Sequence, residues 1–335
     1  MKDILMKICS AAYDGAASCE TAKVITELIS PYCEKVYRDN IGNVICEVSS
    51  SGEKHVVLSA HMDKIGLVVT GIDRETGMLK INRAGGVDLR TLSAARVKVN
   101  GKKTLYGCIT STPPHLTSGD KKKVTPVEGL FVDTGLEFSQ VSEYVSPGDR
   151  VEYYSPVTPL VGDRLTGAYM DNSAGCLAVI EAVKMIKEKG TENRVTAVFT
   201  TREEVGKGGA QGAFFALQPD FAFITDVSFG SAPGIPPESS SPLGSGAMIC
   251  ISPILQREVS SLLIKKAEDE NIPYTLEVMG ARTATDSDVA VVAGKGIKTG
   301  LVSVPLLNMH TPVETLSLSD VKAVSDILYL ASKGE

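Results

Sequence analysis

Acidic and histidine residues recur where apolar, β-like runs of this sequence come to an end. The stretch TAVFTTREEVGKGGA places Glu203 and Glu204 between such a run and a glycine-rich loop. Similar junctions elsewhere carry further nitrogen and oxygen donors, namely His61, Asp63, Asp171, Asp226 and His310. Because the carboxyl ends of parallel strands meet at one edge of a sheet, we expect these side chains to converge there. A donor set of this kind can hold two metal ions.

Three of these segments indicate a chemical role. His61 and Asp63 are two residues apart, so in an extended chain both side chains share one face, and the carboxylate can orient the imidazole of a metal ligand. The alternative is a hydrogen-bonded structural pair. Asp171 precedes a predicted helix, so it is either an N-cap or a carboxylate that bridges two cations. Glu203 and Glu204 end a buried strand, where adjacent charges are unfavourable unless a cation lies nearby.

The other two candidates are less distinctive when taken singly. Asp226 ends a predicted buried strand in ITDVS, and most such aspartates only form turns. His310 follows a strand in LLNMHTPVE, before a proline turn. The chain has four histidines, of which we expect His55 to lie at the surface and His115 to be structural.

Composition narrows the class of protein. The 335 residues exceed what one core usually takes, so we expect one large domain and a smaller one. The hydrophobic share of 43% is typical of a folded globular chain, and the net charge of −6 argues against a basic nucleic-acid-binding face. Seven cysteines without a C-x-x-C pair argue against disulfides, and no apolar run reaches the roughly 18 residues of a membrane span. We therefore expect a cytoplasmic protein without nucleic-acid or membrane partners.

The pattern of elements predicts an α/β domain with a β-rich insertion. Residues 67–159 contain short β-like runs separated by Gly, Pro and Asp, as in a small barrel or sandwich. Residues 1–66 and 160–335 alternate amphipathic helices with apolar strands, which predicts a mixed, mostly parallel sheet covered by helices on both faces. Predicted helices span residues 1–12, 18–36, 173–189, 209–218, 257–271, 286–296 and 317–334, and predicted strands after the insertion span 193–201, 221–227, 274–279 and 298–305.

Other catalytic chemistries lack their motifs. There is no G-x-S-x-G nucleophile elbow, no P-loop and no G-x-G-x-x-G after the first strand. A glycoside hydrolase is the main rival, with Glu203 and a second carboxylate as acid and nucleophile. Sugar clefts favour aromatic platforms, and this chain has no Trp.

The motifs follow one another in a distinctive order along nearly the whole chain: His61-x-Asp63, Asp171-Asn172, Glu203-Glu204-Val205-Gly206, Asp226, Thr285-Asp286 and His310-Thr-Pro-Val-Glu314. In this order they resemble the glutamyl aminopeptidase and tetrahedral aminopeptidase family of metallopeptidases. The resemblance implies a peptidase α/β domain with an inserted PDZ-like β-barrel. It also implies that the barrel serves dimerisation and assembly into a homo-oligomer such as a dodecamer.

The same resemblance implies a reaction and a ligand set. The reaction removes the N-terminal residue of a peptide substrate with the help of two divalent metal ions, for which zinc or cobalt suits these donors better than magnesium. Glu203 would be the general base, and Asp63 would lie behind His61. One ion would be bound by His61, Asp171 and Glu204, and the other by Asp171, Asp226 and His310.

Three positions depart from the family pattern. Lys64 stands where a Glu is usual, Ser173 where an Arg is usual, and Leu307-Asn308-Met309 where an Arg-Tyr pair is common. None of them removes an implied ligand, so they bear on substrate preference and assembly contacts instead. A related metal-dependent deacylase, acting on N-acyl amino acids, is the second alternative function.

Overall fold

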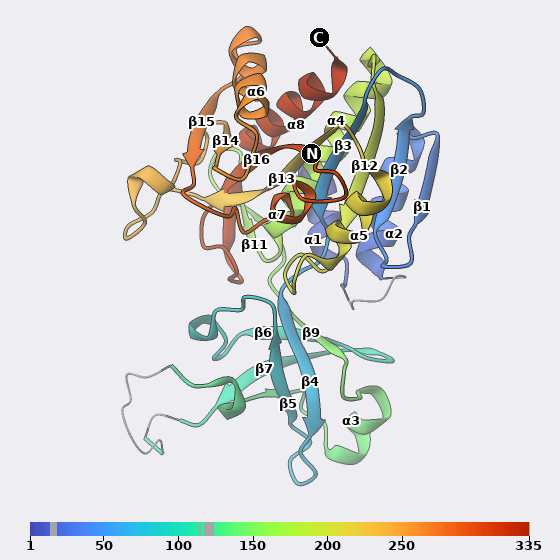
Figure 1. The fold of residues 1–335 in the computed structure, drawn as a ribbon. Coiled ribbons are helices and arrows are strands. Elements are labelled where there is room, and N and C mark those ends of the chain that lie inside the picture. The colour runs from blue at the N-terminus through green and yellow to red at the C-terminus, as the bar shows by residue number, and fades with distance from the viewer. Residues whose placement is uncertain (14–18, 114, 117–123, 335) are drawn as a thin grey trace.

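The computed structural model describes the chain except residues 14–18, 114, 117–123 and 335. Figure 1 shows an α/β domain, which carries both chain ends, and a β-barrel that extends from its lower edge. The chain enters the barrel after the third strand, β3, and returns to the α/β domain before the longest helix, α4. The predicted arrangement of an α/β domain with a separate barrel is confirmed.

The elements of the α/β domain lie on both sides of the barrel in sequence. Those before the barrel are α1 (Lys2–Ser10), α2 (Glu20–Ile29), β1 (Lys35–Arg38), β2 (Val44–Ser49) and β3 (His55–His61). Those after it are β10 (Thr158–Pro159), β11 (Arg164–Gly167), α4 (Met170–Lys189), β12 (Arg194–Thr200), α5 (Gly208–Leu217), β13 (Phe221–Phe229), β14 (Ala247–Ile251), α6 (Arg257–Asp269), β15 (Tyr274–Val278), α7 (Ser287–Ala290), β16 (Lys298–Leu306), β17 (Glu314–Ser317) and α8 (Leu318–Lys333).

The main sheet has eight strands in the order β1-β2-β12-β3-β13-β16-β14-β15. Its four central strands, β12, β3, β13 and β16, run parallel to one another. Two pairings are antiparallel on either side of them, β2 with β12 and β14 with β16. The sheet is therefore mixed and mostly parallel, as predicted, and the carboxyl ends of its central strands meet at one edge.

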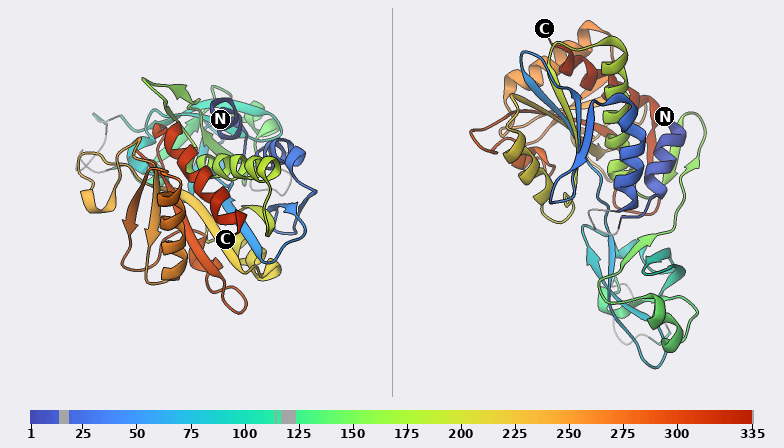
Figure 2. Two further views of the ribbon diagram at one scale, coloured as in Figure 1. Left: turned by 90° about the horizontal axis from the view of Figure 1, so that it is seen from above. Right: turned by 90° about the vertical axis from the view of Figure 1, so that its right-hand side faces the viewer.

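Helices cover both faces of this sheet because its central strands are apolar on both sides. In β3, Val56 and Leu58 belong to the core beneath α1, α2, α4, α6 and α8, whereas Val57 packs toward α5 and α7. Figure 2 shows α1 and α2 on one side of the sheet and α5 on the other. Alternate side chains of a strand point to opposite faces, so a continuous apolar run requires two covered faces.

The barrel closes six strands around its own apolar core. Its strands are β4 (Gly66–Ile72), β5 (Leu79–Ala84), β6 (Arg96–Asn100), β7 (Thr104–Ser111), β8 (Leu130–Asp133) and β9 (Arg150–Tyr153), and they close in the order β4-β5-β8-β7-β6-β9. The helix α3 (Phe138–Tyr144) packs beside them. Leu79, Val99 and Val151 are fully buried inside. Of the two architectures that the β-like runs allowed, the structure forms the barrel.

Several elements differ from the sequence-based expectation. The predicted helix 18–36 is shorter, since α2 ends at Ile29, a 3-10 turn follows at Ser30–Tyr32, and β1 begins at Lys35. The predicted helix 286–296 is much shorter, since α7 ends at Ala290 and Gly294 and Gly296 adopt positive φ angles that a helix does not contain. The strand β14 was not predicted. Its five residues, AMICI, are too few to show a period, although the run lies buried between β16 and β15.

Among the described residues, no helix has the length and apolarity needed to cross a bilayer. No disulfide joins two of the described cysteines, in agreement with their spacing.

Candidate metal centre

The donor residues gather at the carboxyl edge of the four central strands. His61 is the last residue of β3, and Asp226 lies near the end of β13. Glu203 and Glu204 follow β12 by three and four residues, and His310 follows β16 by four. Asp171 reaches the same edge from the start of α4, where its backbone angles are not yet helical. The parallel arrangement of the strands thus brings six residues from five distant segments of the sequence to one site.

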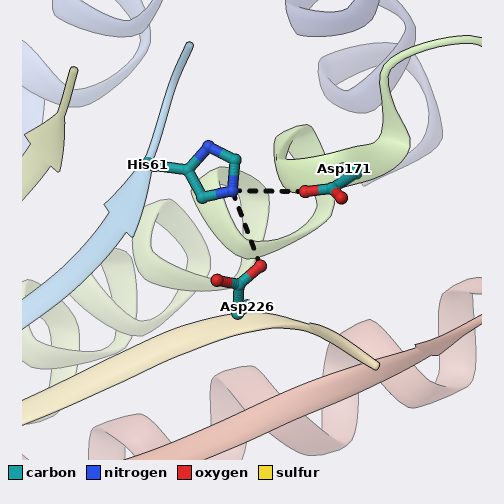
Figure 3. Close-up of side chains that lie close together, drawn as sticks. All are labelled: His61, Asp171 and Asp226. Carbon is teal, nitrogen blue, oxygen red and sulfur yellow. Dashed lines mark ion pairs between the residues drawn. The ribbon is translucent and has the colours of Figure 1, made fainter. Parts of the chain in front are cut away.

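The first donor group contains His61, Asp171 and Asp226. The Nε2 atom of His61 lies 3.2 Å from Oδ1 of Asp171 and 3.5 Å from Oδ1 of Asp226, as drawn in Figure 3. All three residues are buried. Oδ1 of Asp171 is buried and accepts no hydrogen bond from any residue that the structure describes. Three buried donors that face one point, one of them without a hydrogen bond, match the needs of a cation.

The second donor group contains Asp171, Glu204 and His310. The Nε2 atom of His310 lies 3.2 Å from Oδ2 of Asp171 and 3.4 Å from Oε1 of Glu204. Asp171 therefore offers one oxygen to each group, which fits a bridging carboxylate better than an N-cap. The two donor groups divide differently from the partition that the resemblance implies, because Glu204 groups with His310 and Asp226 with His61. Strand order alone does not account for this division, because β3 neighbours both β12 and β13. Glu204 and His310 meet in the segments beyond the strand ends, four residues past β12 and β16.

Asp63 holds two parts of the site together. Its Oδ1 accepts a hydrogen bond of 3.0 Å from the backbone N–H of Glu203, and its Oδ2 one of 3.1 Å from that of Glu204. The same Oδ1 lies 3.5 Å from Nδ1 of His61. One buried carboxylate thereby positions the imidazole at the end of β3 and the backbone of the two glutamates after β12.

Glu314 plays a matching part for the other two segments. Its Oε2 accepts hydrogen bonds from the backbone N–H groups of Met170, at 2.7 Å, and Asp171, at 3.2 Å. Its Oε1 accepts one of 2.8 Å from the N–H of His310. Sequence reasoning recorded Glu314 only as the end of the HTPVE motif and gave it no role. The feature of the sequence that could have indicated Glu314 is an acidic residue four positions after His310, a predicted ligand.

Glu203 lies beside the two donor groups and belongs to neither of them. Its side chain lines a cavity of about 410 Å³, which also contacts both histidines and Asp171. The Nζ of Lys207 lies 3.2 Å from Oε1 of Glu203. Burial raises the pKa of Glu203 to about 8, against the opposing effect of His61. A partly desolvated carboxylate at the cavity wall is suited to accept and return a proton.

The electrostatics of the cluster show a surplus of buried negative charge. Burial raises the pKa values of Glu204 and Asp226 above the usual range for carboxyl groups. Burial alone would lower the pKa of His310, but Asp171 and Glu204 outweigh it and raise the pKa to about 11. The negative charge of the carboxylates thus favours the protonated forms of the histidines and of the carboxyl groups themselves. Divalent cations would balance the same charge, so the residues present fit a pair of metal ions.

A further buried carboxylate, Asp286, stands close to the cluster without joining it. Its Oδ2 accepts a hydrogen bond of 2.5 Å from the hydroxyl of Thr200, at the end of β12. Its Oδ1 has no hydrogen-bond partner among the described residues. Burial raises the pKa of Asp286 to about 7. In the sequence, Asp286 stood out only as part of the Thr285-Asp286 motif, with no predicted role.

The histidines outside the predicted ligand set lie outside both donor groups. His115 is exposed. His55 is only half-buried at the first residue of β3, and its Nε2 lies 2.9 Å from the hydroxyl of Thr196.

The departures from the family pattern fall at different places. The ammonium of Lys64 is buried and donates hydrogen bonds to the backbone carbonyls of Ile8, Cys9 and Ala11, so it closes the carboxyl end of α1. Ser173 is buried in the first turn of α4. In the third segment, Leu307 pairs with Thr315, and Met309 lines the cavity. Only the third departure contributes to the wall of the cavity.

Comparisons with known proteins identify the family. The family model of the M42 glutamyl aminopeptidases matches residues 42–327, so this chain belongs to that family. The family indicated by the sequence motifs is confirmed, and with it the class of enzyme, a peptide hydrolase of the aminopeptidase type.

Named relatives agree over almost the whole length. The lysyl aminopeptidase of Pyrococcus furiosus is 30% identical and aligns over 92% of this chain and 88% of its own. Among solved structures, an aminopeptidase from Desulfurococcus kamchatkensis superposes with a TM-score of 0.92 at 28% identity, over 99% of this chain and 94% of that one. The TET1 peptidase of Pyrococcus horikoshii superposes with a TM-score of 0.87 at 30% identity, over 99% and 98%.

The two hydrogen bonds to Asp63 lead to a prediction for Asp63→Asn. An amide has one acceptor oxygen, so one of the two N–H groups of Glu203 and Glu204 loses its partner, and the carboxylate behind His61 is lost. We expect the affinity for divalent metal to fall by about 10- to 100-fold, the usual effect of removing such a supporting group. Competition with a chromophoric chelator measures it.

The matched control is Asp269→Asn, at the exposed end of α6. It should bind metal like the original protein. Equal metal affinity in Asp63→Asn and the control would contradict the positioning role of Asp63.

Proposed function

We propose that this chain is an aminopeptidase whose site binds two divalent metal ions and uses Glu203 as the general base. The observation that carries the proposal is the placement of Asp171, whose two oxygens face two separate donor groups 3.2 Å from a histidine each. Zinc or cobalt fits these imidazole and carboxylate donors. When bound, such ions polarise a carbonyl and make water more acidic.

The residues of the chain would perform the remaining steps. Glu203 accepts a proton from the attacking water and then delivers it to the leaving amine. Lys207, 3.2 Å from Glu203, holds that carboxylate at the cavity wall. Phe229, Met279 and Met309 line the same cavity and offer apolar surface to the side chain of the N-terminal residue. The cavity volume of about 410 Å³ suits one residue and the following peptide bond.

Removal of single N-terminal residues is the reaction that the relatives suggest. Besides the two donor groups, the charged side chains that line the cavity are Glu203 and Lys207, and these two pair with each other. The family description and the name of the Pyrococcus furiosus relative both refer to aminopeptidases, one glutamyl and one lysyl. Peptides with a free amino terminus are therefore the proposed substrates.

A substrate panel separates this function from its rivals. We expect hydrolysis of aminoacyl p-nitroanilides with a free amine, and none of N-acetylated aminoacyl anilides, N-acyl amino acids or β-glucans. A strong chelator should abolish the activity, and zinc or cobalt should restore it. Cleavage of glucan that survives the chelator would favour the glycoside hydrolase, and cleavage of N-acyl amino acids alone would favour the deacylase.

Substitution of the two adjacent glutamates should affect different properties, turnover for Glu203 and metal binding for Glu204. Glu203→Gln keeps the shape but removes the base, so we expect both metal ions to bind and turnover to fall by roughly 10²- to 10⁴-fold. Glu204→Gln should instead weaken metal binding, because a neutral amide is a poorer ligand than a carboxylate. Metal titration alongside kinetics measures both. If Glu203→Gln lost metal while Glu204→Gln lost only rate, the two roles would be exchanged.

The proposal extends to assembly and location. The TET1 peptidase of Pyrococcus horikoshii can assemble into a tetrahedron or a large octahedral shell, and we infer a homo-oligomer for this chain too, with the barrel in its contacts. A cytoplasmic location agrees with the absence of disulfides among the described cysteines.

Multi-angle light scattering checks the assembly. It should give a mass several times that of one chain, constant over a wide range of protein concentration. A single-chain mass throughout that range would rule the oligomer out.

A further inference from the structure

The barrel reaches into the metal centre at one point. Gly85 and Gly86 directly follow β5 and approach residues of the α/β domain. The backbone carbonyl of Gly86 lies 3.0 Å from Nδ1 of His310, and Gly86 lines the same cavity as Glu203. These residues are 224 positions apart in the sequence, so only the placement of the barrel brings them together.

This contact fixes which nitrogen of His310 carries a proton. A carbonyl oxygen can only accept a hydrogen bond, so the Nδ1 atom facing it must be the donor. The other nitrogen, Nε2, points at Asp171 and Glu204 and is the one left to bind a metal ion once its proton is displaced. Metal-binding histidines commonly use this arrangement, with the second ring nitrogen held by a carbonyl or a carboxylate. For His61 the corresponding group is Asp63, within the α/β domain.

The fit between the barrel and the site leaves no room for a side chain. A Cβ atom at Gly86 would lie 2.7 Å from Nδ1 and 2.9 Å from Cε1 of His310. A Cβ atom at Gly85 would lie 3.0 Å from Cγ2 of Ile65 and 3.4 Å from Cβ of Glu204, and Gly85 has a φ of +88°. The turn thus rests against two of the three donors of the second group.

His310 is correspondingly held from two sides. Its φ of 64° is uncommon for a residue with a side chain, and its backbone N–H is fixed by the carboxylate of Glu314. Its ring is fixed by the carbonyl of Gly86. The backbone contact comes from the α/β domain and the ring contact from the barrel.

We propose that the turn at Gly85 and Gly86 is a positioning element of the second donor group, so that the barrel sets the metal affinity of the group formed by Asp171, Glu204 and His310. The first group, with His61 and Asp226, has no such contact with the barrel among the described residues. The inference rests on the proposed function only in assuming that divalent metal binds at these groups. It gives the inserted barrel a role in the site itself, in addition to any role in assembly.

The variant Gly86→Ala tests this. The φ of Gly86 lies outside the positive range, so alanine fits the backbone, and the clash with the ring of His310 is the local consequence. Titration with zinc and with cobalt, using a competing chelator, should show one ion bound as in the original protein. The other should bind about 10- to 100-fold more weakly. The control is Gly71→Ala in β4, where the nearest atom to a new Cβ is Cδ of Lys80 at 3.9 Å, and both ions should bind unchanged.

A double variant shows whether the effect passes through His310. His310→Ala alone should weaken the same single ion, and Gly86→Ala added to it should cause no further loss, because the ring that clashes is gone. Additive losses, or unchanged binding of both ions in Gly86→Ala, would overturn the inference. Two ions bound by the original protein without any aminopeptidase activity would instead contradict the proposed function and leave this inference standing.

Discussion

The site depends on a single shared carboxylate. Asp171 stands between His61 and His310, with one oxygen 3.2 Å from each. The remaining donors belong to one side or the other, Asp226 to the group of His61 and Glu204 to that of His310. A carboxylate in this position needs a fixed backbone, and Asp171 obtains one from Glu314, which accepts its N–H group. Two further carboxylates, Glu204 and Asp226, complete the groups. Buried carboxylates in this number are unfavourable unless a positive charge lies among them. The same arrangement of donors therefore requires a compensating cation and offers it a binding site.

Supporting carboxylates solve the problem of precision. The donors follow the ends of strands, where the backbone is free to turn, yet metal ligands require placement within fractions of an ångström. Asp63 holds the segment after β12, and Glu314 holds both the start of α4 and the segment after β16. Each of them binds two or more backbone N–H groups, so each links two elements that the sheet alone leaves independent. The rigid parallel strands bring the segments near one another, and these two residues fix their final positions.

The sequence predicted those parts of the molecule that depend on local patterns. Apolar strands followed by acidic or histidine residues indicated the donor edge, and the change to short β-like runs indicated the insertion. It could not predict how the donors divide, because that depends on the paths of the segments beyond β12 and β16, which bring Glu204 to His310 and which no local pattern encodes. Strand β14 escaped for a similar reason, since five apolar residues fit several structures. The carbonyl of Gly86 was beyond reach altogether, because a backbone atom has no residue type to signal its role.

The position of the inserted barrel follows from the same edge of the sheet. The chain leaves β3 at His61, a proposed ligand, and begins the first barrel strand at Gly66, so only a few residues separate the first donor group from the barrel. An insertion at that point cannot be neutral toward the site. The inserted segment must either avoid the donors or contact them. The turn at Gly85 and Gly86 contacts them: the carbonyl of Gly86 faces the ring of His310, and the lack of side chains on both glycines allows this close approach. A module joined at this junction is therefore in a position to influence the chemistry, whatever else its outer surface binds.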